Sequence, residues 1–94
     1  MRLSSITLGG FKTFARPTDI LFEGGVTAQI TVIGDGSTDL DLYLVDDNGN
    51  IVLRDEGETD NCQVTLTPKW TGPFLVRIAN RGYRPNRYML KVAR

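Results

Sequence analysis

The sequence contains no histidine and only one cysteine, Cys62, among its 94 residues. The absence of histidine excludes a serine or cysteine catalytic triad and a histidine-ligated metal site. A single cysteine excludes a disulfide within the chain and a zinc site built from several cysteines. Cys62 lies in the alternating segment Asn61-Cys62-Gln63-Val64-Thr65-Leu66, so we expect a buried structural thiol rather than a reactive one.

An excess of charge of either sign is also missing. Lysine and arginine number 11, aspartate and glutamate number 11, and the formal net charge is +0. This balance argues against a dedicated nucleic-acid-binding or membrane-surface protein. No apolar run approaches the length of about 18–20 residues that a membrane-spanning helix needs. The apolar residues near the N-terminus are interrupted by Ser, Thr, Gly and Lys12, and the sequence predicts no signal peptide.

Helical periodicity is nearly absent, and apolar residues recur instead at every second position in short segments separated by Gly, Pro, Asn and Asp. The predicted strands are 3–8, 19–23, 26–33, 40–45, 50–54, 62–66, 74–78 and 88–92. Asn48-Gly49 is typical of a tight hairpin and predicts that 40–45 pairs with 50–54. About eight short strands in one small domain, residues 1–94, predict an antiparallel, jelly-roll-like β-sandwich.

A series of turn and strand motifs follows in order along the chain: 22–25 (Phe-Glu-Gly-Gly), 34–43, 46–50, 60–62, 68–74, 76–82 and 86–88. Together they make residues 19–92 resemble the bacterial pre-peptidase C-terminal family of β-sandwich domains. That resemblance implies a non-catalytic module of secreted proteins, often hydrolases, with extracytoplasmic parent proteins. It also implies Ca²⁺ as a ligand, because some related domains bind calcium.

Residues 1–18, which include Leu8-Gly9-Gly10-Phe11-Lys12-Thr13-Phe14, resemble the extreme N-terminus of structural-maintenance-of-chromosomes ATPases. In that family a hairpin leads into a phosphate-binding loop. Here Gly34-Asp35-Gly36-Ser37-Thr38-Asp39 follows the corresponding strand, and it lacks the Gly-Lys-Ser/Thr ending that holds phosphates and Mg²⁺. ATP hydrolysis therefore does not carry over. The two resemblances meet near Phe22, which suggests a fused or engineered chain with an N-terminal hairpin segment, 1–18, on a core of 19–94.

Acidic residues are concentrated between Asp35 and Asp60. Calcium takes about six to eight oxygen ligands in irregular geometry, so converging loops could hold it. The candidate ligands are Asp39, Asp41, Asp46, Asn48, Asn50 and Asp60. The alternative, which the sequence favours, is a set of turns in which these side chains bond nearby backbone N–H groups. Asp39 and Asp41 fall on the polar face of their strand, where we expect solvated side chains and no acid–base pair.

Basic residues are concentrated in the last third of the chain, which has no acidic residue after Asp60. The candidate interaction residues are Arg77, Arg81, Arg84 and Arg87, with Tyr83 and Tyr88 between them. One interpretation is a nucleic-acid- or protein-binding surface. The other, which the sequence favours, is an exposed strand face that neutralises a neighbouring acidic strand.

The single tryptophan, Trp70, lies between Pro68 and Gly72. It is either an exposed binding aromatic or a plug that closes one end of the sandwich, and its place at a strand entrance favours the plug. We expect Phe11 and Phe14 to cover an open sheet edge.

The sequence therefore predicts a non-enzymatic accessory or interaction module, with Ca²⁺ as the one cofactor suggested. The alternative is a nucleic-acid- or protein-binding domain that uses the basic C-terminal strands. A protein partner or self-association fits the charge pattern better than nucleic acid, and no membrane partner is expected.

Overall fold

A computed structural model describes residues 3–10 and 18–94, with side chains from Asp19 onward. The described residues form eight β-strands and no helix. The strands are β1 (Leu3–Gly10), β2 (Thr18–Phe22), β3 (Ala28–Ile33), β4 (Leu40–Val45), β5 (Ile51–Asp55), β6 (Asn61–Leu66), β7 (Gly72–Asn80) and β8 (Asn86–Ala93). The predicted all-β class and the eight strands are confirmed. No helix in this part of the chain is long and apolar enough to cross a membrane. The expectation for Phe11 and Phe14 concerns residues outside the described part.

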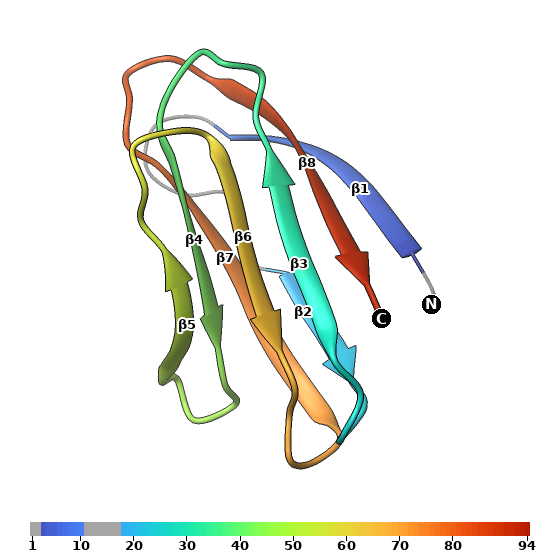
Figure 1. The fold of residues 1–94 in the computed structure, drawn as a ribbon. Coiled ribbons are helices and arrows are strands. Elements are labelled where there is room, and N and C mark those ends of the chain that lie inside the picture. Colours follow the sequence, from blue (N-terminus) through green and yellow to red (C-terminus); the bar gives the residue numbers. More distant parts are fainter. Residues whose placement is uncertain (1–2, 11–17) are drawn as a thin grey trace.

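Two four-stranded antiparallel sheets pack face to face (Figure 1). One has the strand order β1-β8-β3-β6 and the other β2-β7-β4-β5. Consecutive strands often lie in different sheets, so β7 and β8 belong to opposite layers. Eight strands in two such sheets form a jelly roll, as predicted.

The core follows the predicted alternation. In β3, Ala28, Ile30 and Val32 are buried, and in β8 Tyr88, Leu90 and Val92 are buried. The remaining buried members of the core are Phe22, Leu40, Leu42, Leu44, Cys62, Val64, Val76 and Ile78. Burial of each such aliphatic side chain stabilises the fold by about 1.5–3 kcal/mol. Inward side chains of both sheets thus interdigitate in one hydrophobic layer.

The hairpin between β4 and β5 forms where the Asn-Gly pair predicts it. Gly49 has φ 85°, a conformation that favours glycine, and the Asp46 N–H bonds the Asn50 carbonyl at 2.9 Å. A register shift between Leu44 and Val45 was not anticipated. This bulge turns Ile51 outward, with 48% of its surface exposed, while Leu53 packs against the core. Ile51 and Leu53, two positions apart in the predicted strand 50–54, therefore do not share a face.

The loops gather at the two ends of the sandwich (Figure 1). The Trp70 end, at the bottom of Figure 1, carries the β2–β3, β4–β5 and β6–β7 loops, residues 23–27, 46–50 and 67–71. The Asn86 end, at the top, carries residues 34–39, 56–60 and 81–85. These two ends contain most of the residues that the sequence singles out.

Candidate functional site

A buried asparagine joins three loops at the Asn86 end. Nδ2 of Asn86 donates to Oδ2 of Asp60 at 3.0 Å and to the main-chain oxygen of Thr38 at 3.2 Å. Oδ1 of Asn86 accepts from the Asp35 N–H at 3.1 Å, and Oδ2 of Asp60 also accepts from the Gly36 N–H at 2.6 Å. Because these buried groups satisfy one another, the Asp60 carboxylate stabilises loop structure.

Two other carboxylates cap turns. Oδ1 of Asp46 accepts from the N–H groups of Asn48 and Asn50 at 3.0 and 2.8 Å, and these bonds lower the pKa of Asp46 below 3.8, the one to Asn50 most. Asp35 accepts from the Ser37 hydroxyl and from the N–H groups of Ser37 and Arg87. The Ser37 hydroxyl is the main reason that the pKa of Asp35 is also lowered. Both carboxylates act as turn caps, the alternative that the sequence favours.

The side chain of Asp41 is buried, with 5% of its surface exposed, and pairs with Nε of Arg81 at 3.1 Å. The expected solvated position of Asp41 is wrong, because β4 is a central strand in which Asp41 lies opposite Ala79 of β7. Burial, followed by the nearby charge of Asp39, raises the pKa of Asp41. Asp39 itself is partly buried, and its Oδ1 has no hydrogen-bond partner among the described residues.

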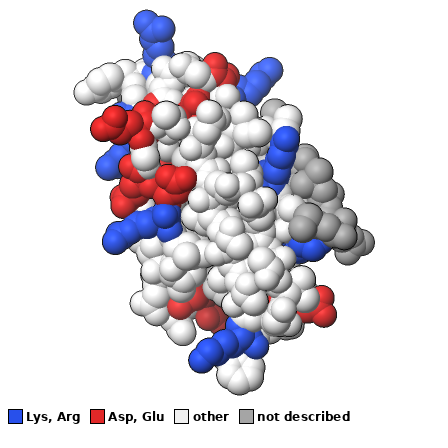
Figure 2. Space-filling view, viewed as in Figure 1, with Lys and Arg blue, Asp and Glu red and all other residues white. Residues whose placement is uncertain are grey.

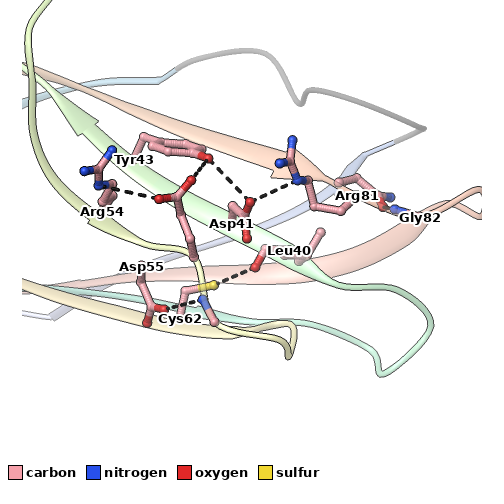
Figure 3. A network of polar contacts seen from close by, with 11 residues as sticks. Leu40, Asp41, Tyr43, Arg54, Asp55, Cys62, Arg81 and Gly82 are labelled. Carbon is pink, nitrogen blue, oxygen red and sulfur yellow. Dashed lines mark hydrogen bonds and ion pairs between the residues drawn. The ribbon is translucent and has the colours of Figure 1, made fainter.

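The Asp41–Arg81 pair belongs to a row of polar side chains on the outer face of the β4–β5–β7 sheet (Figure 3). The Tyr43 hydroxyl donates to Oε2 of Glu56 at 2.7 Å and lies 3.4 Å from Oδ2 of Asp41. Arg54 pairs with Glu56 at 3.5 Å. The bond to Glu56, together with burial, raises the pKa of Tyr43 to about 12. The two arginines, Arg54 and Arg81, therefore neutralise the carboxylates of Glu56 and Asp41 on this face.

The six residues predicted to bind calcium do not converge. Asp46, Asn48 and Asn50 lie in the β4–β5 turn at the Trp70 end, whereas Asp60 belongs to the Asn86 network at the other end. Among residues 19–94, whose side chains are described, no three acidic, cysteine or histidine side chains are grouped to hold a metal ion. Instead of sharing one calcium site, these carboxylates cap separate turns or, in the case of Asp41, form an ion pair.

The four candidate arginines do not form one surface either. Arg77 lies in β7 beside Tyr43 of β4, whereas Arg87 lies in β8 of the opposite sheet. Arg81 and Arg84 follow β7 in the loop at the Asn86 end, and Arg81 faces Asp41. Two strands that are consecutive in sequence enter different layers, so their basic residues point away from each other.

Trp70 is exposed over 79% of its surface, so the prediction that it plugs the sandwich is wrong. Pro68 is buried instead, and its carbonyl accepts from the Gly25 N–H at 2.7 Å. The loop is therefore anchored through Pro68, and Trp70 points outward. Other exposed apolar side chains near the Trp70 end are Leu21 (64%), Val26 (36%), Ile51 (48%) and Val52 (41%). Of these, Val52 lines the same groove as Trp70.

A groove of about 330 Å³ lies beside Trp70, between the β6–β7 loop and the β4–β5 hairpin. Asp46, Asp47 and Val52 contribute from the hairpin side, and Phe74 contributes from β7. The Phe74 ring packs edge-on against the buried Phe22, with 5.7 Å between ring centroids. One wall of the groove is therefore continuous with the hydrophobic core.

The loop that carries Trp70 is held by the β2–β3 loop. The Gly24 N–H donates to Oγ1 of Thr71 at 2.9 Å. A Cβ atom on Gly24 would lie 2.9 Å from the Thr71 nitrogen and from the Trp70 carbonyl carbon, so no larger residue fits without displacing the loop. Trp70 is exposed on a fixed main chain.

Charged residues are unevenly spread over the visible face (Figure 2). Acidic and basic side chains gather along the edge on the side of β5, whereas most of the surface over β3 and β6 carries no charge. The outward residues of these two strands include Gln29, Thr31, Gln63 and Thr65. On this face, acidic side chains are therefore concentrated along the β5 edge and at the two ends.

The sequence indicated Trp70 as a candidate contact residue, but not Asp47 and Val52, its neighbours in the groove. The Asn48-Gly49 turn was the available signal for Asp47, because it brings the hairpin to the end of the sandwich. Val52 carried no such signal, since it is exposed through the bulge opposite Leu44 and Val45.

No family model matches the chain. In sequence it is similar to the chromosome partition protein Smc of Mycolicibacterium paratuberculosis, Mycobacterium leprae and Mycobacterium tuberculosis, with 48% identity over 57 residues in each case. The match covers 57% of this chain and 5% of the relative, so the chain spans a small part of the length of these curated proteins. The resemblance to structural-maintenance-of-chromosomes proteins is supported, over 57 residues and thus over more of the chain than the predicted segment 1–18, whereas the pre-peptidase C-terminal family is not confirmed.

The fold is similar to that of Aeromonas hydrophila PliG, described as a periplasmic lysozyme inhibitor of g-type lysozyme. The TM-score is 0.71 at 13% identity, and the match covers 97% of this chain and 84% of PliG. At this identity the likeness establishes the fold alone. The chain is therefore a β-sandwich with a fold similar to that of PliG, and more than half of its sequence is similar to a small part of Smc.

Proposed function

We propose that this chain is a non-catalytic protein-binding module whose contact surface is the Trp70 end. The observation that carries the proposal is Trp70 itself, which is 79% exposed on a loop held by hydrogen bonds from Gly24 and Gly25. Tryptophan is enriched among the residues that dominate binding energy in protein interfaces. A fixed main chain lowers the entropy lost on binding, because less of the loop has to be ordered.

The chemistry of the acidic residues supports a non-catalytic role. The carboxylates of Asp35, Asp46 and Asp60 accept backbone or amide hydrogen bonds, and Asp41 pairs with Arg81. Each of these groups has a structural partner, and the chain contains no histidine to act beside them. The separation of Arg77 and Arg87 onto opposite sheets makes a nucleic-acid-binding strip less suitable than a protein contact at one end.

The structural neighbour points to the same class of function. PliG is described as a periplasmic inhibitor of g-type lysozyme, and an inhibitor of this kind acts by binding another protein. By analogy with PliG, we propose that this chain also has a protein partner and an extracytoplasmic location. That the chain arose by recombination, with an Smc-like segment joined to the sandwich, stays a hypothesis.

The proposal is tested with two probes, a random peptide library displayed on phage and a purified g-type lysozyme. Both are offered to the wild-type chain and to the variants Trp70→Ala and Tyr83→Ala, the latter being a fully exposed aromatic in the loop at the other end (100% exposed). We expect binding to fall at least about tenfold in Trp70→Ala and to stay within about twofold in Tyr83→Ala. If neither probe yields a complex that depends on Trp70, the proposal is wrong.

A further inference from the structure

We infer that the groove beside Trp70 receives an arginine or lysine side chain of the partner protein. This inference rests on the proposed function and specifies its chemistry. The groove, about 330 Å³ in volume, can accommodate a single long side chain. Its walls combine carboxylates on the hairpin side with aromatic and aliphatic surface on the other sides.

The hairpin side of the groove is negative. Asp46 and Asp47 both line it, and no lysine or arginine is among the described residues that do. Asp46 stays ionised at neutral pH, because the N–H groups of Asn48 and Asn50 stabilise its carboxylate. Asp47 is exposed, and its carboxylate makes no hydrogen bond or ion pair with the described part of the chain. A cation of the partner protein therefore meets the Asp46 carboxylate, which is held by hydrogen bonds, and the Asp47 carboxylate, which is available to form an ion pair.

The remaining walls suit the rest of a basic side chain. A guanidinium or ammonium group over the indole of Trp70 gains a cation–π interaction. Val52 and Phe74 offer apolar surface to the methylene stem. The indole and the carboxylates thus suit the cationic group of an arginine or lysine, and the apolar walls suit its methylene stem. An acidic side chain or a wholly apolar one would match only part of this lining.

Two other grooves on the molecule lack this combination. The groove on the outer face of the β4–β5–β7 sheet is lined by Arg54, Arg77 and Arg81 together with Glu56, and Glu56 already pairs with Arg54, so this groove offers no free carboxylate to a cation. The groove on the other side of the Trp70 end contains Glu23 together with Arg94, and Arg94 donates to the Leu21 carbonyl at 3.1 Å. Of these three grooves in the described part of the chain, the one that Trp70 borders combines acidic residues with no basic residue.

The inference is tested by nuclear magnetic resonance with a fragment probe, N-acetyl-argininamide, and its uncharged isostere N-acetyl-citrullinamide. Because Trp70 is the only tryptophan in the sequence, its indole N–H gives one resolved signal. We expect a saturable shift of that signal and of the 46–48 amides with the arginine probe, and an affinity at least fivefold weaker for citrulline, as an order-of-magnitude estimate. Asp47→Asn should weaken the arginine probe by about threefold or more, whereas the matched control Glu23→Gln should leave it unchanged.

The outcomes separate the inference from the proposed function. Equal binding of the two probes, or an Asp47→Asn variant that binds like the wild type, overturns the cationic occupant. A neutral chito-oligosaccharide that shifts the indole signal more strongly than arginine, in wild type and Asp47→Asn alike, also overturns it. In either case peptides or lysozyme bound through Trp70 would still support a protein-binding end. Loss of all Trp70-dependent protein binding would instead refute the proposed function.

Discussion

Nδ2 of Asn86, the first residue of β8, donates a hydrogen bond of 3.0 Å to Oδ2 of Asp60, the residue before β6. This bond joins the last strand to the loop between β5 and β6, across 26 residues of sequence. Both residues are buried. A buried polar pair therefore contributes to the stability of the Asn86 end.

Substitution Asn86→Ala should lower the free energy of unfolding by about 2–4 kcal/mol, because it removes the acceptor of the Asp35 N–H and the amide donor shared by Asp60 and Thr38. Equilibrium unfolding in urea measures the change. The control is Asn61→Ala, an exposed position at the start of β6, which should change the free energy by less than about 0.5 kcal/mol. Similar values for the two variants would contradict the structural role of Asn86.

The Asp41–Arg81 pair predicts a pH-dependent stability. Burial raises the folded-state pKa of Asp41 above 3.8, so the folded protein holds this proton more tightly than the unfolded chain does. The stability that this proton contributes is fully present below the pKa of Asp41 in the unfolded chain. It is lost as pH rises through the pKa of Asp41 in the folded protein. Relative to wild type, Asp41→Asn should therefore gain stability as pH rises from about 3 to about 7. Urea unfolding across this range measures it, and a constant difference would contradict the raised pKa.

Removal of Arg81, the partner of Asp41, should destabilise the protein near neutral pH, in contrast to Asp41→Asn. Arg81→Met leaves a buried carboxylate beside Asp39 and should destabilise the protein by about 1–2 kcal/mol, since the arginine is itself half exposed. The loss should shrink on acidification, when Asp41 becomes neutral. Arg84→Met, in the same loop and exposed, serves as the control in the same unfolding series.

The Asp46 turn predicts the reverse pH behaviour. Its pKa is lowered below 3.8, so the stabilisation it gives is present above that value and is lost as pH falls through the folded pKa. Asp46→Ala should lower the thermal midpoint at neutral pH, and the difference from wild type should fade in strong acid. Asp47→Ala, the exposed neighbour, should melt like the wild type. Scanning calorimetry at several pH values distinguishes the two variants.

Cys62 should resist thiol reagents in the folded protein. Burial is the main cause that raises its pKa to about 12, and its Sγ lies 3.1 Å from the Leu40 carbonyl oxygen (Figure 3). Labelling with a disulfide reagent at neutral pH should be at least about a thousandfold slower than in urea, because it requires local opening. Rapid labelling of native protein would show that β6 opens far more readily than its burial implies.

Period-two patterning was sufficient to predict the sandwich and the inward faces of β3 and β8, since each strand has one apolar side. It could not predict the burial of Asp41, which depends on the strands placed on either side of β4. The network of Asp35, Asp60 and Asn86 was equally hidden, because its members come from three segments that meet only in the folded chain. Trp70 was identified but oriented wrongly, since the neighbouring Pro68 takes the anchoring position.

The pairing of β1 with β8 has a consequence for biosynthesis. Leu3 lies opposite Ala93 and Gly10 opposite Asn86, so β1 finds its hydrogen-bonding partner only after the six strands between them, β2 to β7, have been translated. Contacts this distant in sequence slow folding. During translation β1 therefore keeps an unpaired edge until β8 has been synthesised, which exposes it to pairing with strands of other nascent chains.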